Sequence, residues 1–256
     1  MGTPTQVFVR VIAKGGKYLG DDIGGALVTI EDVRTGELLK RGFTSGGSGP
    51  QDLMNVCVKR SEVWPINGAS VFPASLDLDG PRLIRVTAYG PLAAQQSANT
   101  VSLTQWVFPV RDKSGVPEAI NFLLELPGLV VQVLNPPTHF MPAKAPQFLE
   151  VRANVTMMCG CPTGTKYWPA EQFHVWAAIT QPGGYRFDLL LTFEADRPDG
   201  APSQFVGTWR PPQNTTGQLA IYEITVTAFQ PATGNAGSDR ATLIIPVPST
   251  KDEPQS

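Results

Sequence analysis

The sequence is poor in the residues on which most enzymes and metal proteins depend. Only two histidines, His139 and His174, and three cysteines, Cys57, Cys159 and Cys161, occur among its 256 residues. Histidine is the usual proton carrier near neutral pH, so general acid–base catalysis has few candidates here. The sequence also lacks a GxSxG elbow, a P-loop, a dinucleotide-binding fingerprint and an HExxH motif. We therefore expect a protein without enzymatic activity.

Charge and long apolar runs are also scarce. The net charge is −2 and the basic residues are scattered, whereas a nucleic-acid binder needs a basic stripe to neutralise phosphates. No apolar run approaches the roughly 20 residues that span a bilayer, so no transmembrane segment is expected. Residues 1–6 lack the basic and apolar parts of a secretory signal, which indicates a cytoplasmic protein or a mature form behind a new start methionine. Three cysteines are too few for a disulfide framework.

Turn-forming residues, by contrast, are abundant. The 25 glycines and 24 prolines show no collagen-like period, so they indicate many short elements joined by tight turns. Hydrophobic residues make up 42% of the chain, which suffices for a packed core. The length fits one large domain or two of ordinary size.

The apolar residues recur mainly every second residue, as in half-buried β-strands. Residues 6–13, for example, alternate Val7, Val9 and Val11 with Phe8, Arg10 and Ile12. The residues Arg34 to Glu37 predict a tight turn between two strands. Strands are expected at 6–13, 26–33, 38–43, 70–76, 82–89, 101–110, 119–126, 129–134, 147–156, 173–180, 185–194, 204–209, 220–229 and 241–247. A turn signal every ten or so residues is typical of a β-sandwich.

Two short segments, 52–59 and 92–98, have helical spacing but are too short to change the fold class. The best boundary between domains lies near Pro127-Gly128. We therefore predict an all-β chain of two consecutive immunoglobulin-like β-sandwich domains, residues 1–127 and 128–248. Residues 249–256 are polar and charged, which predicts a flexible tail.

Two segments resemble known modules. Residues 25–32, the turn at 35–37 and the loop at 44–49 resemble the opening of carboxypeptidase-regulatory-like and other bacterial immunoglobulin-like modules. The segment 222–228, continued through 234–237, is similar to the last hairpin of bacterial immunoglobulin-like repeats. This resemblance covers about a quarter of the chain and implies an extracytoplasmic spacer, an adhesion unit or a carbohydrate-binding accessory. It does not choose among these roles.

The segment Met157-Met158-Cys159-Gly160-Cys161 is the most distinctive stretch of the sequence. Thiolate and thioether are soft donors that favour Cu(I), and imidazole suits copper or zinc. One hypothesis is therefore a soft-metal site, with copper first and zinc second, built from Cys159, Cys161, His139, Met141 and Met157. The stronger interpretation is structural, because consecutive strand residues point to opposite faces and buried methionine and cysteine pack well. A third alternative is redox or disulfide chemistry at the cysteines.

Aromatic and acidic residues give two further hypotheses. Trp64, Trp168 and Trp209 lie at turns, so we expect them to be exposed and to be candidates for stacking on a ligand such as a sugar. Trp106 and Trp176 lie inside strands and are expected to fill the two cores. Asp-rich turns such as 77–80 look like calcium loops but lack the closing glutamate, so ordinary turn chemistry is favoured.

The sequence as a whole favours a non-enzymatic structural or binding module that needs no cofactor. Its loops are expected to recognise a protein or glycan partner, since a sandwich presents its connections at its two ends. Secretion, a periplasmic location or the cell surface is the expected setting. The alternatives are a copper protein centred on residues 157–161 and a carbohydrate-binding accessory domain.

Overall fold

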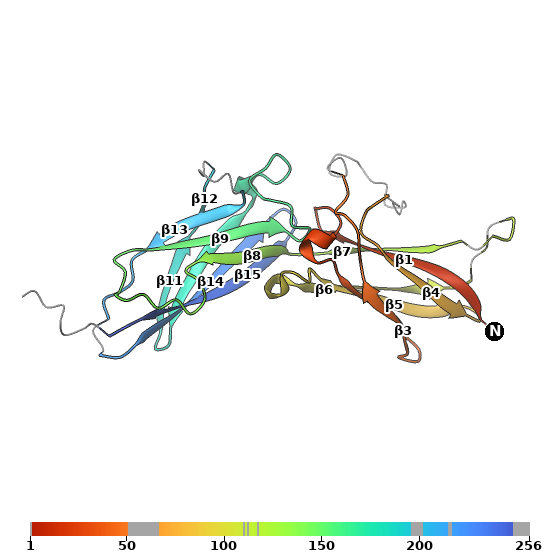
Figure 1. The fold of residues 1–256 in the computed structure, drawn as a ribbon, viewed down its shortest axis with the longest axis horizontal. Helices are drawn as coiled ribbons and strands as arrows, with labels where there is room; N and C mark the ends of the chain where they lie inside the picture. Colours follow the sequence, from red (N-terminus) through yellow and green to blue (C-terminus); the bar gives the residue numbers. More distant parts are fainter. Residues whose placement is uncertain are drawn as a thin grey trace, which may run out of the picture. The chain divides into compact units, whose positions relative to one another are not determined.

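The computed structural model describes residues 2–50, 67–109, 111, 113–116, 118–195, 202–214 and 217–247. The predicted helical segment 52–59, Cys57, Trp64 and the predicted tail lie outside these residues. Nearly all of the regular secondary structure of the described chain consists of β-strands (Figure 1). Three short 3-10 turns interrupt them, at Asp21–Ile23, Gln95–Ser97 and Ala170–Gln172. The second of these occupies the predicted helical segment 92–98. No described helix is long and apolar enough to cross a membrane.

The chain divides into two compact units. The first contains Met1–Gly128 together with Met157–Cys161, and the second contains Leu129–Thr156 and Pro162–Ser256. Each unit has two sheets, so the predicted all-β fold class of two sandwiches is confirmed. The predicted domain limits, taken as the limits of parts that fold independently, stay a prediction.

The first unit pairs a three-stranded sheet with a four-stranded one. The three-stranded sheet has the order β4-β1-β7, in which β1 pairs antiparallel with β4 and parallel with β7. The four-stranded sheet has the order β3-β2-β5-β6 and is antiparallel throughout. The bounds are β1 Thr3–Ala13, β2 Leu27–Asp32, β3 Leu38–Phe43, β4 Phe72–Leu78, β5 Arg82–Gly90, β6 Asn99–Val107 and β7 Ile120–Leu126.

The second unit has two four-stranded sheets, β11-β10-β14-β15 and β12-β13-β9-β8. Its strands are β8 Leu129–Asn135, β9 Leu149–Met157, β10 His174–Gln181, β11 Tyr185–Leu190, β12 Thr192–Phe193, β13 Gln204–Trp209, β14 Ala220–Gln230 and β15 Asn235–Ile245. The single strand expected at 185–194 is split at the buried Leu191, where the chain leaves one sheet for the other. The last strand begins six residues before the expected start at residue 241.

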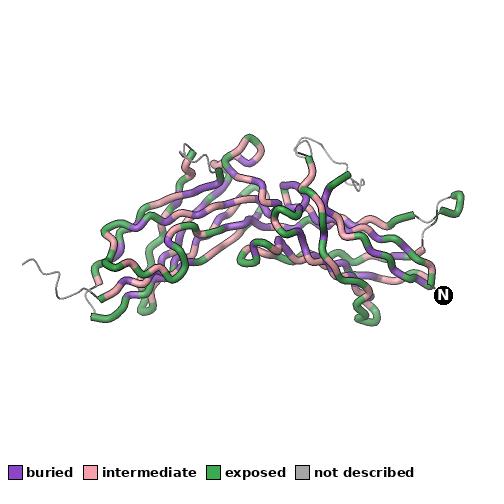
Figure 2. The backbone as a smooth tube through the Cα atoms, viewed as in Figure 1, coloured by how far each residue is buried: buried purple, intermediate pink, exposed green. Residues whose placement is uncertain are grey.

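Period-two alternation places the core of each unit between its sheets (Figure 2). In the first unit, Val7, Val9 and Val11 of β1 are buried, as are Val28 and Ile30 of β2. The predicted turn between β2 and β3 is also present. Asp32 Oδ1 accepts hydrogen bonds from the backbone N–H groups of Arg34 and Thr35, and Gly36 has a φ of 74°.

Candidate functional site

The two cysteines of the segment Met157–Cys161 meet at a tight turn that follows β9. Gly160 has a φ of 76°, and its backbone N–H donates to the carbonyl oxygen of Met157 at 2.8 Å. The backbone N–H of Met157 in turn donates to the carbonyl of Cys161 at 2.9 Å. This geometry brings the Sγ atoms of Cys159 and Cys161 to 2.8 Å. Both are free thiols, with exposed fractions of only 1% and 8%.

The two thiols share one proton unequally. The hydrogen bond from Cys161 is the largest influence on Cys159 and lowers the pKa of its thiol to about 7, although burial acts in the opposite direction. The backbone N–H of Lys17, in the same unit, donates to Cys159 Sγ at 3.4 Å and supports the charged form. The same thiol–thiol bond, together with burial, raises the pKa of Cys161. The thiolate therefore belongs to Cys159 and the retained proton to Cys161.

The structure brings together only part of the predicted soft-metal set. Met157 is fully buried and belongs to the same turn as the two cysteines. His139 and Met141 belong to the second unit, where Phe140 between them pairs with Leu243 of β15. Met141 is 60% exposed. Within the described part of the chain, no three His, Cys, Asp or Glu side chains gather in a group able to hold a metal ion. Metal binding stays a prediction.

The expected exposure is reversed for three tryptophans, Trp106, Trp168 and Trp209. Trp168 and Trp209 are buried, with 3% and 1% of their surface exposed, so the prediction that these turn residues face solvent is wrong. Trp209 packs edge-on against Tyr222 at a ring distance of 5.1 Å, and its indole N–H donates to the Tyr185 hydroxyl. Trp106, expected in the core, is 55% exposed. Stacking on a ligand needs a solvent-facing ring, which Trp168 and Trp209 do not present.

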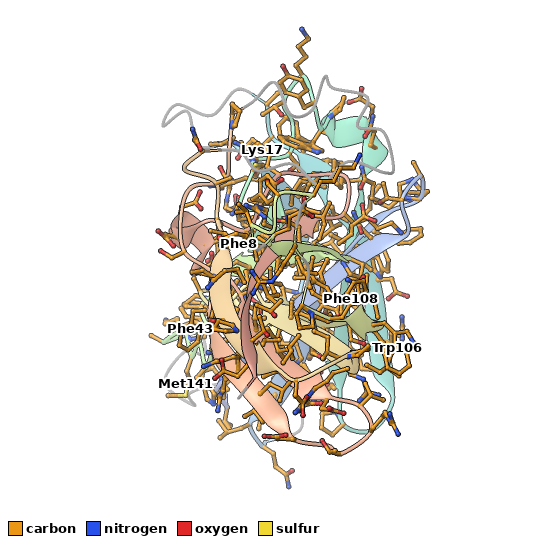
Figure 3. The ribbon with its side chains drawn as sticks, turned by 90° about the vertical axis from the view of Figure 1, so that its right-hand side faces the viewer. Phe8, Lys17, Phe43, Trp106, Phe108 and Met141 are labelled. Atoms are coloured by element: carbon orange, nitrogen blue, oxygen red, sulfur yellow. The ribbon has the colours of Figure 1, made fainter. Side chains whose placement is uncertain are left out.

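Trp106 faces outward because of its position in the alternation of β6. Its cross-strand partner is Leu83 on β5, whereas the buried Val86 pairs with Leu103 on the other face. Trp106 therefore shares the outer face of β6 with the threonine and serine residues at 100, 102 and 104. Phe108, just beyond the strand, is 49% exposed. Figure 3 shows Trp106 and Phe108 on the same side of the ribbon, and Phe43 on the opposite side.

Strand β6 is an edge strand of its sheet, and within the described residues it pairs only with β5 (Figure 1). The ten residues from Asn99 to Phe108 contain no charge and no proline. Five other edge strands each carry at least one charged residue, which discourages pairing with another chain. These residues are Lys40 and Arg41 on β3, Asp77 on β4, Glu125 on β7, Arg186 and Asp188 on β11, and Asp239 and Arg240 on β15.

The two remaining edge strands are protected in other ways. Strand β12 has only two residues. Strand β8 is uncharged, but β15 lies against it, and the backbone N–H of Val133 donates to Asp239 Oδ2 at 2.8 Å. Strand β7 lies against β6 in a similar way, and Asn99 Nδ2 donates to the carbonyl oxygen of Pro127 just beyond β7. Among the described edges, β6 is nevertheless the long uncharged strand that carries tryptophan on its solvent face, and it pairs with no strand other than β5. The absence of charge from Asn99 to Phe108 is visible in the sequence, but the position of this segment at a sheet edge is a property of the fold.

A small polar hollow of about 220 Å³ lies between β3 and β4. Arg82 lines it, and its guanidinium is paired with Asp32 at 3.6 Å, Glu37 at 3.5 Å and Asp79 at 3.5 Å. The cation is thus already neutralised by the chain's own carboxylates. These contacts describe a surface ion-pair network that stabilises the β2–β3 hairpin.

Comparison with known proteins gives only a distant structural likeness. No family model matches the chain, and no curated protein matches it in sequence. Among solved structures, it is similar to the full-length major pilin SpaD of Corynebacterium diphtheriae, with 12% identity and a TM-score of 0.31. It is also similar to the T6 backbone pilin of Streptococcus pyogenes, with 10% identity and a TM-score of 0.31. These alignments cover 94% of this chain but only 66% and 64% of the two pilins, so the chain spans about two thirds of the length of each.

Proposed function

We propose that this chain is a non-enzymatic structural module that self-associates by pairing β6 with β6 of a second copy. The observation that carries the proposal is the uncharged edge of β6, which within the described residues pairs only with β5, and which presents Trp106 to solvent with Phe108 exposed just beyond it. An edge strand directs half of its backbone N–H and C=O groups away from its sheet, so a second strand can add to it by main-chain hydrogen bonds. Recognition then lies on a sheet edge, whereas the sequence favoured loops.

The chemistry of β6 favours a second copy as its partner. In a two-fold symmetric contact the same surface meets itself, so charges on the strand are brought close to charges of the same sign. The absence of charge from Asn99 to Phe108 removes this repulsion in every register. An antiparallel pairing centred on Leu103 would place Trp106 of one copy opposite Thr100 of the other. Aromatic and β-branched cross-strand neighbours of this kind stabilise sheets.

We include an extracytoplasmic location in the proposal as the expected environment of such a module.

Exposed apolar side chains give the β6 contact its affinity. Trp106 lies on the outer face of the strand, and Leu103, which is 36% exposed, lies on the other face. The paired strands would form one continuous antiparallel sheet from two copies. Neither catalysis nor a cofactor has a role in this function.

The test compares two lysine substitutions at opposite edges of the same sheet. Trp106→Lys on β6 and Leu38→Lys on β3 replace apolar side chains of nearly equal exposure, 55% and 53%. We expect the original chain to dimerise with rising concentration in light scattering and sedimentation. Trp106→Lys should raise the dimer dissociation constant at least about 10-fold, or about 1.4 kcal/mol, because it removes the Trp106–Thr100 cross-strand contact at both ends of the pairing and places a charge on the edge strand. Leu38→Lys should leave it unchanged.

Hydrogen exchange locates the contact independently of the variants. On raising the protein concentration, the amides of residues 99–107 should gain protection while those of β3 should not. A chain that stays monomeric at all concentrations contradicts the proposal. So does an equal loss of association in both lysine variants, since the β6 edge is then not the contact.

A further inference from the structure

The turn that holds Cys159 and Cys161 has a geometry suited to sulfur–sulfur chemistry. Their Sγ atoms are 2.8 Å apart. A disulfide requires about 2.05 Å, so the bond needs an approach of less than an ångström. Two thiolates on one tetrahedral zinc, at about 2.3 Å each, lie about 3.8 Å apart, so metal binding needs the sulfurs to separate. The observed spacing is nearer to the first requirement than to the second.

The surrounding chain keeps the two sulfurs in this position. Gly160 adopts the left-handed conformation that the Cys-Gly-Cys turn requires, and a Cβ there would contact Ile23 at 3.6 Å. A Cβ on Gly16 would lie only 3.1 Å from Cys159 Sγ, so the glycine allows the thiol to approach the backbone. The N–H of Lys17 then donates to that sulfur. These contacts all belong to the first unit.

We propose that Cys159 and Cys161 are a reversible dithiol–disulfide pair whose oxidant is a small peroxide. The inference is separate from the proposed function, because it involves neither β6 nor self-association. Cys159 is the nucleophile and Cys161 the resolving thiol. The exposed fractions of 1% for Cys159 and 8% for Cys161 exclude bulky disulfides, so the oxidant has to be as small as hydrogen peroxide, which needs the least opening of the turn.

The reaction proceeds in two balanced steps. The Cys159 thiolate attacks one oxygen of hydrogen peroxide, the O–O bond breaks, and a sulfenic acid and hydroxide form. The hydroxide takes the proton of Cys161, whose thiolate then attacks the Cys159 sulfur and releases a second hydroxide as the S–S bond forms. Two electrons pass from the sulfurs to the peroxide oxygens. Overall, one thiolate, one thiol and one peroxide give a disulfide, one water and one hydroxide, and an added dithiol reductant reverses the oxidation.

The protonation states of the pair fit these roles. Only the thiolate is nucleophilic, and the lowered pKa of Cys159, about 7, leaves about half of it ionised at neutral pH. A thiol with the ordinary pKa of 9.0 would be about 1% ionised at the same pH. Removing Cys161 removes the largest cause of the lowered pKa. The first oxidation step should therefore become at least about ten-fold slower in Cys161→Ala at pH 7.

The experiment uses the full chain with Cys57→Ser, which leaves the two thiols of the pair. After treatment with hydrogen peroxide, intact mass should fall by about 2 Da and both thiols should resist alkylation under denaturing conditions until a dithiol reductant is added. Cys161→Ala in this background should trap a sulfenic acid on Cys159. Cys159→Ala should consume peroxide at least about ten-fold more slowly than the parent.

Several results would overturn the proposal. One is that both thiols stay alkylatable after peroxide treatment of the folded chain. Another is a gain of oxygen atoms on separate cysteines without loss of two hydrogens. A third is disulfide-linked dimers in place of the internal bond. Intact mass and alkylation of the Cys57→Ser chain are enough to distinguish these results, so the test is valid even if an alanine variant fails to fold.

Discussion

At the scale of single residues, Cys159 and Cys161 couple the stability of the reduced protein to pH. The pKa of Cys159 in the folded chain, about 7, lies below its ordinary value of 9.0. Its stabilising contribution is therefore fully present above pH 9 and is lost as the pH falls through 7. The pKa of Cys161 is raised, so its contribution is present below pH 9 and is lost at higher pH. Together, the pair stabilises the fold most near pH 9.

This coupling predicts a pH-dependent difference between two proteins. Under reducing conditions, the free energy of unfolding of the original chain should be compared with that of the double variant Cys159→Ala, Cys161→Ala from pH 6 to 10. The difference should grow by about 2 kcal/mol between pH 7 and 9, since each unit of pKa shift corresponds to about 1.4 kcal/mol, and it should shrink above pH 9. Cys57 is common to both proteins and cancels. A difference that does not vary with pH would show that the thiols do not share a proton.

The tryptophans show where residue-level reasoning from the sequence succeeded and where it failed. Apart from the start of β15 and the split of the strand expected at 185–194, the strands were predicted to within three residues, because alternation is a local property. Exposure was then judged from the position of each tryptophan inside a strand or at a turn, which placed Trp106 and Trp176 in the cores. The alternation itself gives a better answer for both. Trp106 lies in phase with Thr104 and Ser102, and Trp176 lies in phase with His174 and Thr180, so each belongs to the polar face of its strand.

The buried tryptophans needed information that no local pattern contains. Trp209 ends β13, and its partner in the sheet is Leu149, sixty residues earlier in the chain. The ring fills space next to Tyr222 and Tyr185, which come from two further strands. Tertiary packing of this kind decides the burial of a residue at a strand end. The Cys159–Cys161 turn was singled out by composition alone, but the contact with Lys17 depends on the fold.

At the scale of elements, β15 shows how a glycine can lie inside a strand. The sequence predicted a start at residue 241, after a turn at residues 231–235. The structure extends the strand back to Asn235 and brings β8 against it, and a Cβ on Gly237 would overlap the carbonyl oxygen of Leu129. The glycine thus marks a close approach of two backbones within the second unit, and it does not end the strand.

This close approach predicts that Gly237→Ala destabilises the protein. The added methyl group forces β8 away from β15, which should lower the free energy of unfolding by about 3 kcal/mol in denaturant titration. Gly80→Ala is the control, because no atom lies within 4 Å of its added Cβ and its backbone is not in the left-handed region. The control should stay within about 0.5 kcal/mol of the original chain. Equal effects in the two variants would mean that the packing of β8 on β15 is not tight.

At the scale of the whole molecule, the two units are not two uninterrupted stretches of chain. The sequence placed a single boundary at Pro127-Gly128, and the first unit does extend to Gly128. It also includes Met157–Cys161, a segment that follows β9 of the second unit. A hairpin turn of five residues carries too little periodicity to reveal which core it joins. Met157 and Met158 are fully buried, and only the structure reveals that this segment is part of a core.

A cut at the predicted boundary therefore removes part of the first unit. A fragment of residues 1–128 loses the sulfur that accepts the N–H of Lys17 and uncovers the surface that Met157–Cys161 occupied. Leaving one buried donor without a partner costs about 1–3 kcal/mol, and the lost apolar contacts add to this. In the full chain, Cys159→Ala removes the same acceptor but keeps the segment, so it serves as the matched comparison.

The fragment should unfold at a lower denaturant concentration than the first unit of the full chain, and this shift should exceed the shift that Cys159→Ala causes. Hydrogen exchange at residues 13–19 should report the same order. If the fragment is instead as stable as the first unit within the full chain, residues 157–161 contribute nothing to its core.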